Sequence, residues 1–222
     1  MVQGKMTMKE ATKKALDGLF ARYPVLAACR TDVFAAADTI CASFRAGGKL
    51  IACGNGGSAA DAEHIVGELM KGFLKKRRLP EELRTRMKES FPQDADYLYE
   101  NLQGALPALS LVNQVALGTA FANDQAADLV FAQQVMGIGR KGDVLLAIST
   151  SGNSKNVVYA ALAARLQGVR TVALTGRSGG RLRDVADIVV AVPDDETYRI
   201  QELHLPVYHA LCIAAEEEFF GD

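Results

Sequence analysis

The sequence has few of the features that mark several large classes of protein. It contains four cysteines in 222 residues and no CxxC pair, so neither a disulfide framework nor a zinc knuckle is expected. Cys41 and Cys53 lie in apolar surroundings and are expected to be small buried residues. No stretch is long and apolar enough to suggest a membrane-spanning helix, and the lysines near the N-terminus precede no apolar signal core. We therefore expect a cytoplasmic protein without a membrane partner.

The sequence also has no large excess of positive or of negative residues. Twenty-five lysines and arginines stand against 26 aspartates and glutamates, which gives a net charge of −1. This balance, together with the lack of a helix-turn-helix or an attached basic segment, gives no reason to expect a nucleic-acid partner. The glycine-rich stretch CGNGGS (53–58) matches neither GxGxxG nor the P-loop pattern, so no nucleotide fingerprint is present.

The chain length favours one domain, and short apolar runs alternate with helical segments along most of it. Several of these runs are unbroken stretches of Val, Ile and Leu, as in strands that are buried on both faces. The expected strands are 49–54, 105–112, 143–149, 170–176 and 187–192. The alternation predicts an α/β protein with a parallel sheet that is flanked by helices on both faces.

Two amphipathic helices are expected first, within about residues 6–24 and 31–46. Thr31 is a candidate N-cap for the second of them, which a pair of glycines then ends. The most polar part of the chain follows later, and we interpret about 79–104 as a helical insertion or lid, with a solvated surface insertion as the alternative. The last helix, about 199–219, contains Pro206, which lacks an amide donor and is predicted to interrupt or kink it.

The loop STSGNS (149–154) follows the apolar run DVLLAI and opens the next helix. In an open α/β sheet, ligands bind at the carboxyl ends of the strands, and the free N–H groups of a helix N-terminus favour an anion. Its hydroxyl groups belong to Ser149, Thr150, Ser151 and Ser154. Gly152 permits a tight turn, and the absence of lysine and arginine predicts that dipoles and hydroxyls hold a phosphate, as suits a sugar phosphate. The alternative is a plain turn with an N-cap, for which one hydroxyl would be enough.

Only three histidines occur, and two of them lie near acidic or amide residues at suggestive spacings. His64 and Glu68 are four residues apart on a predicted helix and therefore share a face, although such a pair is often simply solvated. Together with Gln201 and His209 they could form a mixed nitrogen and oxygen site of the type that suits zinc. Gln201 and His209 are separated by about 12 Å along a straight helix. They meet only if the helix start frays, if Pro206 bends the helix, or if different subunits contribute.

Several motifs together resemble the SIS domain family, and most closely the phosphoheptose isomerases of the GmhA type. They are CGNGGSAADAEHIVGEL, FAND, GDVLLAISTSGNSKNV, TVALTGRSGGRL, ADIVVAVP and RIQELHLPVYH. The resemblance covers about residues 35–217 and implies that residues 1–222 form a single SIS domain with a five-stranded parallel sheet, which includes the N-terminal helices (1–46) and the polar helical insertion (about 79–104). It also implies a homotetramer with active sites between subunits. Two features depart from the family pattern: the link at about 79–104 is longer, and Tyr198 replaces an aspartate.

The resemblance also implies residue roles. The substrate-binding residues would be Asn55, Gly56, Gly57, Asn123, Asp124, Ser149, Thr150, Ser151, Ser154 and Gln201. The zinc ligands would be His64, Glu68, Gln201 and His209. Glu68 and His209 would be the acid/base pair for converting sedoheptulose 7-phosphate to D-glycero-D-manno-heptose 7-phosphate through an enediolate, a reaction that needs a base, a proton donor and stabilisation of negative charge.

Two alternative functions remain open at this point. DiaA, a related protein that associates with a replication initiator, uses the same fold as a non-catalytic tetrameric scaffold. It keeps the RIQE motif but lacks a histidine at the position of His209, so the presence of His209 here favours an enzyme. The other alternative is an isomerase or a binding protein for a different sugar phosphate.

Overall fold

The computed structural model describes residues 8–221, and its centre is one parallel β-sheet with the strand order β2-β1-β3-β4-β5. The strands are β1 (Leu50–Cys53), β2 (Ala108–Ser110), β3 (Val144–Ile148), β4 (Arg170–Thr175) and β5 (Ile188–Ala191). The predicted five-stranded parallel sheet is therefore confirmed. The edge strand β2 is shorter than the predicted 105–112, since Pro107 has no amide to donate and enters the sheet only by accepting a bond from the Leu50 amide (2.9 Å).

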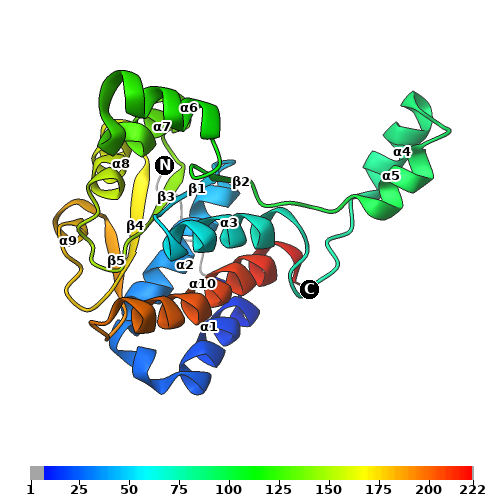
Figure 1. Cartoon of the computed structure of the whole chain (residues 1–222). Coiled ribbons are helices and arrows are strands. Elements are labelled where there is room, and N and C mark those ends of the chain that lie inside the picture. The colour runs from blue at the N-terminus through cyan, green and yellow to red at the C-terminus, as the bar shows by residue number, and fades with distance from the viewer. Residues whose placement is uncertain (1–7, 222) are drawn as a thin grey trace, which may run out of the picture.

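Helices cover both faces of the sheet (Figure 1), and alternate residues of the strands face two separate hydrophobic cores. Leu50 and Leu146 face one group of helices, whereas Ile51 and Leu145 face the other. The first group is α1 (Glu10–Arg22), α2 (Arg30–Arg45), α3 (Gly57–Met70) and α10 (Thr197–Phe220). The second is α7 (Val130–Ile138), α8 (Lys155–Leu166) and α9 (Leu182–Val185), and α6 (Val115–Phe121) contacts α7. Helices on both faces explain why the strands are almost continuously apolar.

The start of α2 differs from the prediction. A 3₁₀-helix, Pro24–Cys29, leads directly into α2, which begins at Arg30 and so includes Thr31 in its first turn. Thr31 is therefore not the N-cap, because no extended residue separates the two helices. The predicted end is confirmed, since Gly47 follows the helix with a positive φ of 78°. The predicted first helix, 6–24, corresponds to α1, and residues 6 and 7 lie outside the described part.

Pro206 does not interrupt the last helix. The helix α10 is continuous from Thr197 to Phe220 with Pro206 inside it. The proline leaves the carbonyl of Glu202, four residues earlier, without an intrahelical amide. Glu202 is exposed, so water can satisfy that carbonyl, and the cost of the proline is reduced.

The insertion at 79–104 is helical, as predicted, and forms a hairpin of α4 (Glu81–Ser90) and α5 (Ala95–Asn101). It projects away from the rest of the fold in Figure 1, and Ala95 is the one buried residue that its two helices contain. The hairpin leaves the body near the end of α3, whereas the glycine-rich loop precedes the start of α3. Within one chain it is consequently a projecting arm and not a lid over that loop.

No helix among residues 8–221 combines the length and the apolar character needed to cross a bilayer.

Candidate functional site

The loops that follow β1 and β3 lie side by side, because these two strands are neighbours in the sheet. The sheet order reverses direction here, with β2 on one side of β1 and β3 on the other. Asn55, in the first loop, and Asn156, in the first turn of α8 after the second loop, exchange two reciprocal amide hydrogen bonds of 2.9 and 2.8 Å. The loops 54–56 and 149–154, which we call the cradle, therefore form one surface at the place where open α/β sheets bind ligands.

The hydroxyl-rich loop of the cradle has an ordered structure of its own. Ser149 Oγ donates to Ser154 Oγ (3.1 Å), and Ser151 Oγ accepts a bond from the amide of Asn153 (3.1 Å). Gly152 adopts a positive φ of 66°, and a Cβ there would collide with the carbonyl of Gly179. Only glycine permits both the turn and this close approach.

The structure does not support the alternative in which a hydroxyl of this loop serves as the N-cap of the next helix. Ser154 occupies the N-cap position of α8, yet within residues 8–221 its side chain makes no capping hydrogen bond. The N-cap Gly56 of α3 has no side chain with which to cap. Some first-turn amides have other partners, since Ser58 and Ala59 donate to the carbonyls of Asn55 and Gly56, and Val157 donates to Asn156 Oδ1. Among the described residues, the amides left as donors for an anion are those of Gly57, Lys155 and Asn156.

The remaining predicted substrate residues lie in two places: Gln201 is beside the cradle, and Asn123 and Asp124 are in a separate turn. A Cβ on Gly57 would collide with the side-chain amide of Gln201, so Gln201 lies against the cradle at the start of α3. Asn123 and Asp124 lie in an exposed π-helical turn, Ala122–Ala126, where Asn123 Nδ2 donates to Asp124 Oδ1 (2.9 Å). Among the described residues, no hydrogen bond links these two side chains to the cradle.

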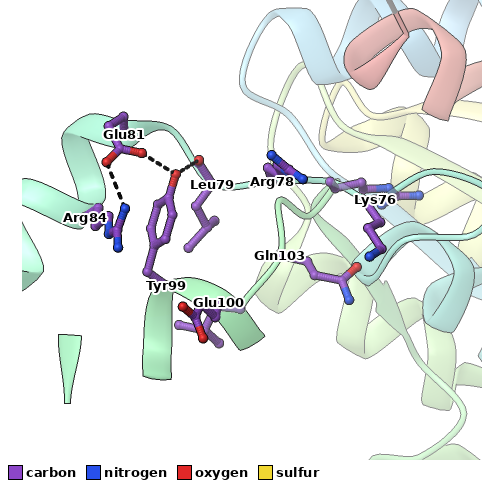
Figure 2. A pocket seen from close by; sticks show the side chains of 10 residues that line it. Lys76, Arg78, Leu79, Glu81, Arg84, Tyr99, Glu100 and Gln103 are labelled. Carbon is purple, nitrogen blue, oxygen red and sulfur yellow. Dashed lines mark hydrogen bonds and ion pairs between the residues drawn. The ribbon is translucent and has the colours of Figure 1, made fainter. Parts of the chain in front are cut away.

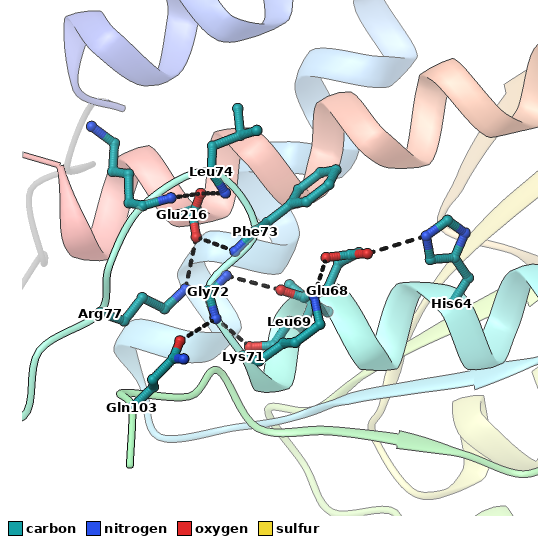
Figure 3. A network of polar contacts seen from close by, with 11 residues as sticks. His64, Glu68, Leu69, Lys71, Gly72, Phe73, Leu74, Arg77, Gln103 and Glu216 are labelled. Atoms are coloured by element: carbon teal, nitrogen blue, oxygen red, sulfur yellow. Dashed lines mark hydrogen bonds and ion pairs between the residues drawn. The ribbon is translucent and has the colours of Figure 1, made fainter. Parts of the chain in front are cut away.

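A second group of polar side chains gathers further along α3 and α10. His64 Nε2 lies 3.2 Å from Glu68 Oε1, and the rings of His64 and His209 have centroids 5.1 Å apart in an edge-to-face arrangement. Lys71 Nζ donates to the other carboxylate oxygen, Glu68 Oε2 (2.9 Å), as Figure 3 shows. The Glu68 side chain is only 12% exposed. The predicted spacing of His64 and Glu68 on one helical face is thus confirmed, and His209 joins them.

A chain of hydrogen bonds holds His64 from the other side. Its Nδ1 lies 3.1 Å from the hydroxyl of Tyr208, which donates to Asp61 Oδ1 (3.2 Å). Burial raises the pKa of Asp61, and it also raises the pKa of Tyr208 above its usual value. Burial and the neighbouring His64 lower the pKa of His209, so its imidazole is neutral near pH 7.

The side chains of His64, Glu68 and His209, which we call the cluster, are of the types that bind a divalent metal ion. Their arrangement in this structure does not form a complete metal site. His209 Nε2 is buried and has no hydrogen-bond partner within the described chain. Buried polar atoms are normally paired, so this nitrogen is available to bind a ligand. Imidazole and carboxylate are donors that zinc accepts. Across residues 8–221, however, no three His, Cys, Asp or Glu side chains converge on one point in the manner of a metal site.

The cradle lies beside the first turns of α3 and α10, whereas the cluster lies further along the same two helices. Gln201 contacts the start of α3, whereas His209 contacts His64, so α3 and α10 run side by side in the same direction. Glu68 follows Gly57 by eleven residues, which corresponds to about 16 Å of helix. The structure does not bring Gln201 together with His209 in one chain, and the four-ligand zinc site stays a prediction.

Sequence reasoning missed several residues that contact the predicted site. They are Asn156, Asp61, Lys71 and Tyr208. Asp61 and Lys71 are each three residues from a predicted ligand on α3, and that spacing is a signal that could have identified them. Tyr208 and Asn156 reach the site only through tertiary contacts.

A separate cleft of about 470 Å³ lies between the hairpin and the segment after α3 (Figure 2). Its lining includes Lys76, Arg78, Arg84, Tyr99 and Glu100. The hydroxyl of Tyr99 lies within hydrogen-bond distance of Glu81 Oε2 (2.8 Å) and of the carbonyl of Leu79 (3.0 Å), and this contact closes the hairpin at its base. This cleft is lined by none of the predicted catalytic or substrate residues.

All four cysteines are buried and free, as predicted for Cys41 and Cys53. Burial raises the pKa of the Cys29 thiol to about 11 and those of Cys41, Cys53 and Cys212 to about 12. They remain protonated at neutral pH and are unreactive.

The chain matches the family model of the SIS domain over residues 24–109 and 91–176. A phosphoheptose isomerase from Akkermansia muciniphila is 38% identical over 214 residues, which are 96% of this chain and 100% of that protein. Among solved structures, the phosphoheptose isomerase GmhA from Neisseria gonorrhoeae is 33% identical with a TM-score of 0.67, over 93% of this chain and 91% of that one. A phosphoheptose isomerase from Francisella tularensis is 29% identical with a TM-score of 0.69, over 91% and 98% of the two chains. With matches of this extent in sequence and fold, the chain belongs to the SIS domain family and, within it, to the phosphoheptose isomerases.

Proposed function

We propose that this protein is an aldose-ketose isomerase that converts sedoheptulose 7-phosphate to D-glycero-D-manno-heptose 7-phosphate. The observation that supports this most directly is the buried carboxylate of Glu68. Lys71 and His64 hold its two oxygens, and the unpartnered Nε2 of His209 belongs to the ring beside His64. A fixed carboxylate next to a neutral imidazole is the pair of groups that proton transfer between adjacent carbons requires.

In this proposal the reaction moves one carbon-bound proton. Glu68 removes a proton from C1 of the ketose and returns one to C2, so that an enediolate forms and collapses without net change in atoms. His209 passes a proton between the oxygens on C1 and C2. Its lowered pKa suits this role, because a neutral imidazole can both accept and donate a proton near pH 7.

The cradle would bind the other end of the substrate. The hydroxyls of Ser149, Thr150, Ser151 and Ser154 and the amides that open α3 and α8 would hold the phosphate. Asn55, Gly56, Gly57, Gln201, Asn123 and Asp124 would contact the sugar. Anchoring a non-reacting phosphate in this way lowers the entropic cost of bringing C1 to the base.

We also propose that His64, Glu68 and His209 hold a zinc ion, with Gln201 as a fourth ligand. A bound divalent ion would polarise the carbonyl and hydroxyl oxygens of the substrate and stabilise the enediolate charge. The buried, unpartnered His209 Nε2 supports this proposal.

A second copy of the chain would complete the site. The helix rise from Gly57 to Glu68 is about 16 Å, which is longer than one phosphorylated heptose can span. The cradle of one copy would therefore face the cluster of another, in a homo-oligomer that we propose to be a tetramer. The four free, buried thiols favour a reducing compartment such as the cytoplasm.

The test is an isomerase assay with sedoheptulose 7-phosphate, with and without added zinc. Glu68→Gln should lower kcat by at least about 1,000-fold and leave substrate binding intact, because the amide cannot accept the carbon proton. The matched control is Glu63→Gln, an exposed glutamate on the same helix, which should behave as wild type.

Each other outcome would point to a different function. Wild-type inactivity in the presence of zinc would contradict the proposal, and tight association with a replication initiator would then favour the scaffold. Turnover of another ketose phosphate alone would retain the chemistry and replace the substrate.

A further inference from the structure

The end of α3 is capped by an arginine that lies seven residues beyond it. Arg77 Nη1 donates to the carbonyl of Leu69 (2.5 Å), and Arg77 Nη2 donates to the carbonyl of Glu68 (2.9 Å) (Figure 3). The last carbonyls of a helix have no intrahelical partner, and a cation at this end also interacts favourably with the helix dipole. One planar guanidinium therefore binds two successive main-chain carbonyls, the first of which belongs to Glu68.

A buried carboxylate fixes this arginine. Arg77 Nε donates to Glu216 Oε1 (2.9 Å), and the two side chains are 0% and 1% exposed. Glu216 also accepts three amide bonds of 2.7–3.1 Å, from Phe73, Leu74 and Lys75. The carboxylate from α10 thus orders the whole turn that follows α3 and leaves the guanidinium a single orientation.

The same network holds the base of the projecting hairpin. The carbonyl of Arg77 accepts a bond from the amide of Gly104 (2.7 Å), and the amide of Gly72 donates to Gln103 Oε1 (2.8 Å). Both ends of the hairpin therefore close on the segment that carries Arg77.

We propose that Arg77, held by Glu216, is a positioning residue that sets the location of the Glu68 carboxylate. The inference rests on the proposed role of Glu68 as the base. Two of the three hydrogen bonds that the Arg77 side chain makes go to the carbonyls of Glu68 and its neighbour, so a shift of the guanidinium shifts the backbone of Glu68. A displacement of about 1 Å at a reacting group can cost about 100-fold in rate.

The experiment is the kinetic analysis of Arg77→Lys in the full-length protein. Lysine keeps the positive charge beside Glu216, but its single ammonium cannot reproduce the planar fork that spans two carbonyls and a carboxylate. We expect kcat to fall about 10- to 100-fold, KM to change less than about threefold, and the protein to remain folded. The matched control is Arg84→Lys on the hairpin, whose guanidinium pairs with Asp96 and Glu81 instead, and which should keep the wild-type kcat.

If Arg77→Lys does not fold, a second variant, Glu216→Gln, tests the same inference. Glu216→Gln keeps the oxygen that accepts the amides of Leu74 and Lys75 and replaces the oxygen that faces Arg77 Nε by an uncharged NH2 group. Because this removes the charge that orients Arg77, the variant should also lower kcat without raising KM. An unchanged kcat in a folded Arg77→Lys or Glu216→Gln protein, or a change confined to KM, would overturn the inference.

A structural measurement separates this inference from the proposed function. In a crystal structure of Arg77→Lys, the main chain of Glu68 should be displaced by at least about 0.5 Å while His64 stays in place, since about 0.5 Å is the tolerance of a productive site. An inactive wild-type protein would overturn the proposed function alone. In that case an unmoved Glu68 in the variant would overturn the positioning role as well, and a displaced Glu68 would support it.

Discussion

Asn55 and Asn156 exchange two amide hydrogen bonds, of 2.9 and 2.8 Å, and so join the loop after β1 to the start of the helix after β3. Each side chain uses both its donor and its acceptor in this pair. Asn156 Oδ1 also accepts the amide of Val157 (3.0 Å). The two halves of the cradle are consequently fixed relative to each other before any ligand binds.

Removal of this link should weaken substrate binding more than it slows the chemical step. Asn156→Ala is expected to raise KM for the sugar phosphate about fivefold, with kcat within about twofold of wild type, because a lost hydrogen-bonded link is worth about 1 kcal/mol. Steady-state kinetics measures both constants. The matched control is Asn101→Ala, whose amide bonds only the carbonyl of Tyr97 on the hairpin. Equal losses in the two variants would contradict a specific role for Asn156.

Gly152→Ala should destabilise the folded protein by about 1–3 kcal/mol, because a non-glycine residue is strained at a positive φ and the added Cβ would meet the carbonyl of Gly179. Urea unfolding measures the change. Gly18→Ala in α1 is the control, since no atom lies within 4 Å of the added Cβ there, and it should stabilise the helix by about 0.5–1 kcal/mol. A Gly152→Ala protein as stable as wild type would show that the close approach to Gly179 is absent in solution.

His209→Ala tests the proposed metal independently of turnover. We expect bound zinc per chain, measured by elemental analysis after dialysis, to fall at least about tenfold, because one of two imidazole donors is lost. Treatment of the wild-type protein with a chelator should lower kcat, and added zinc should restore it. Zinc content that is unchanged in His209→Ala would remove His209 from the ligand set.

His204 should make stability depend on pH. It is fully buried, and burial lowers its pKa from 6.5 to about 4. As the pH falls below 6.5, the unfolded chain takes up the proton first, so the free energy of unfolding decreases between about pH 6.5 and pH 4, by about 3 kcal/mol in total. Above pH 6.5 the effect is absent.

The variant His204→Leu isolates this contribution from those of buried carboxylates such as Glu216. Denaturant unfolding of both proteins between pH 4 and 7.5 should show that the variant gains stability relative to wild type as the pH falls. Parallel curves for the two proteins would contradict the assignment.

Much of the fold could be predicted from local patterns. The unbroken apolar run of β3 and the short run of β1 identified buried strands, because each lies between turn residues and is too short for a helix. Local rules failed where neighbouring elements changed the outcome. Thr31 has the chemistry of an N-cap, but a preceding 3₁₀-helix left it no cap position, and α10 continues through Pro206 without interruption.

The candidate site, like the fold, could be predicted only in part from local spacing. The spacing of His64 and Glu68 predicted their shared face, since four residues make about one helical turn. That Tyr208 holds His64 depends on how α10 packs against α3, and no local spacing reveals it.

The sequence by itself determined the strands, the cradle loop and the faces of the helices, because these follow from the periodicity of side chains and from the φ angles that glycine permits. Tertiary structure alone decided that Glu216 and Arg77, 139 residues apart, form the buried pair that binds the end of α3. It also decided that Gln201 lies at the cradle while His209 lies at the cluster. The reason is that a buried contact between remote segments depends on the relative placement of whole helices, which the packing of the two hydrophobic cores sets and the spacing within one segment does not encode.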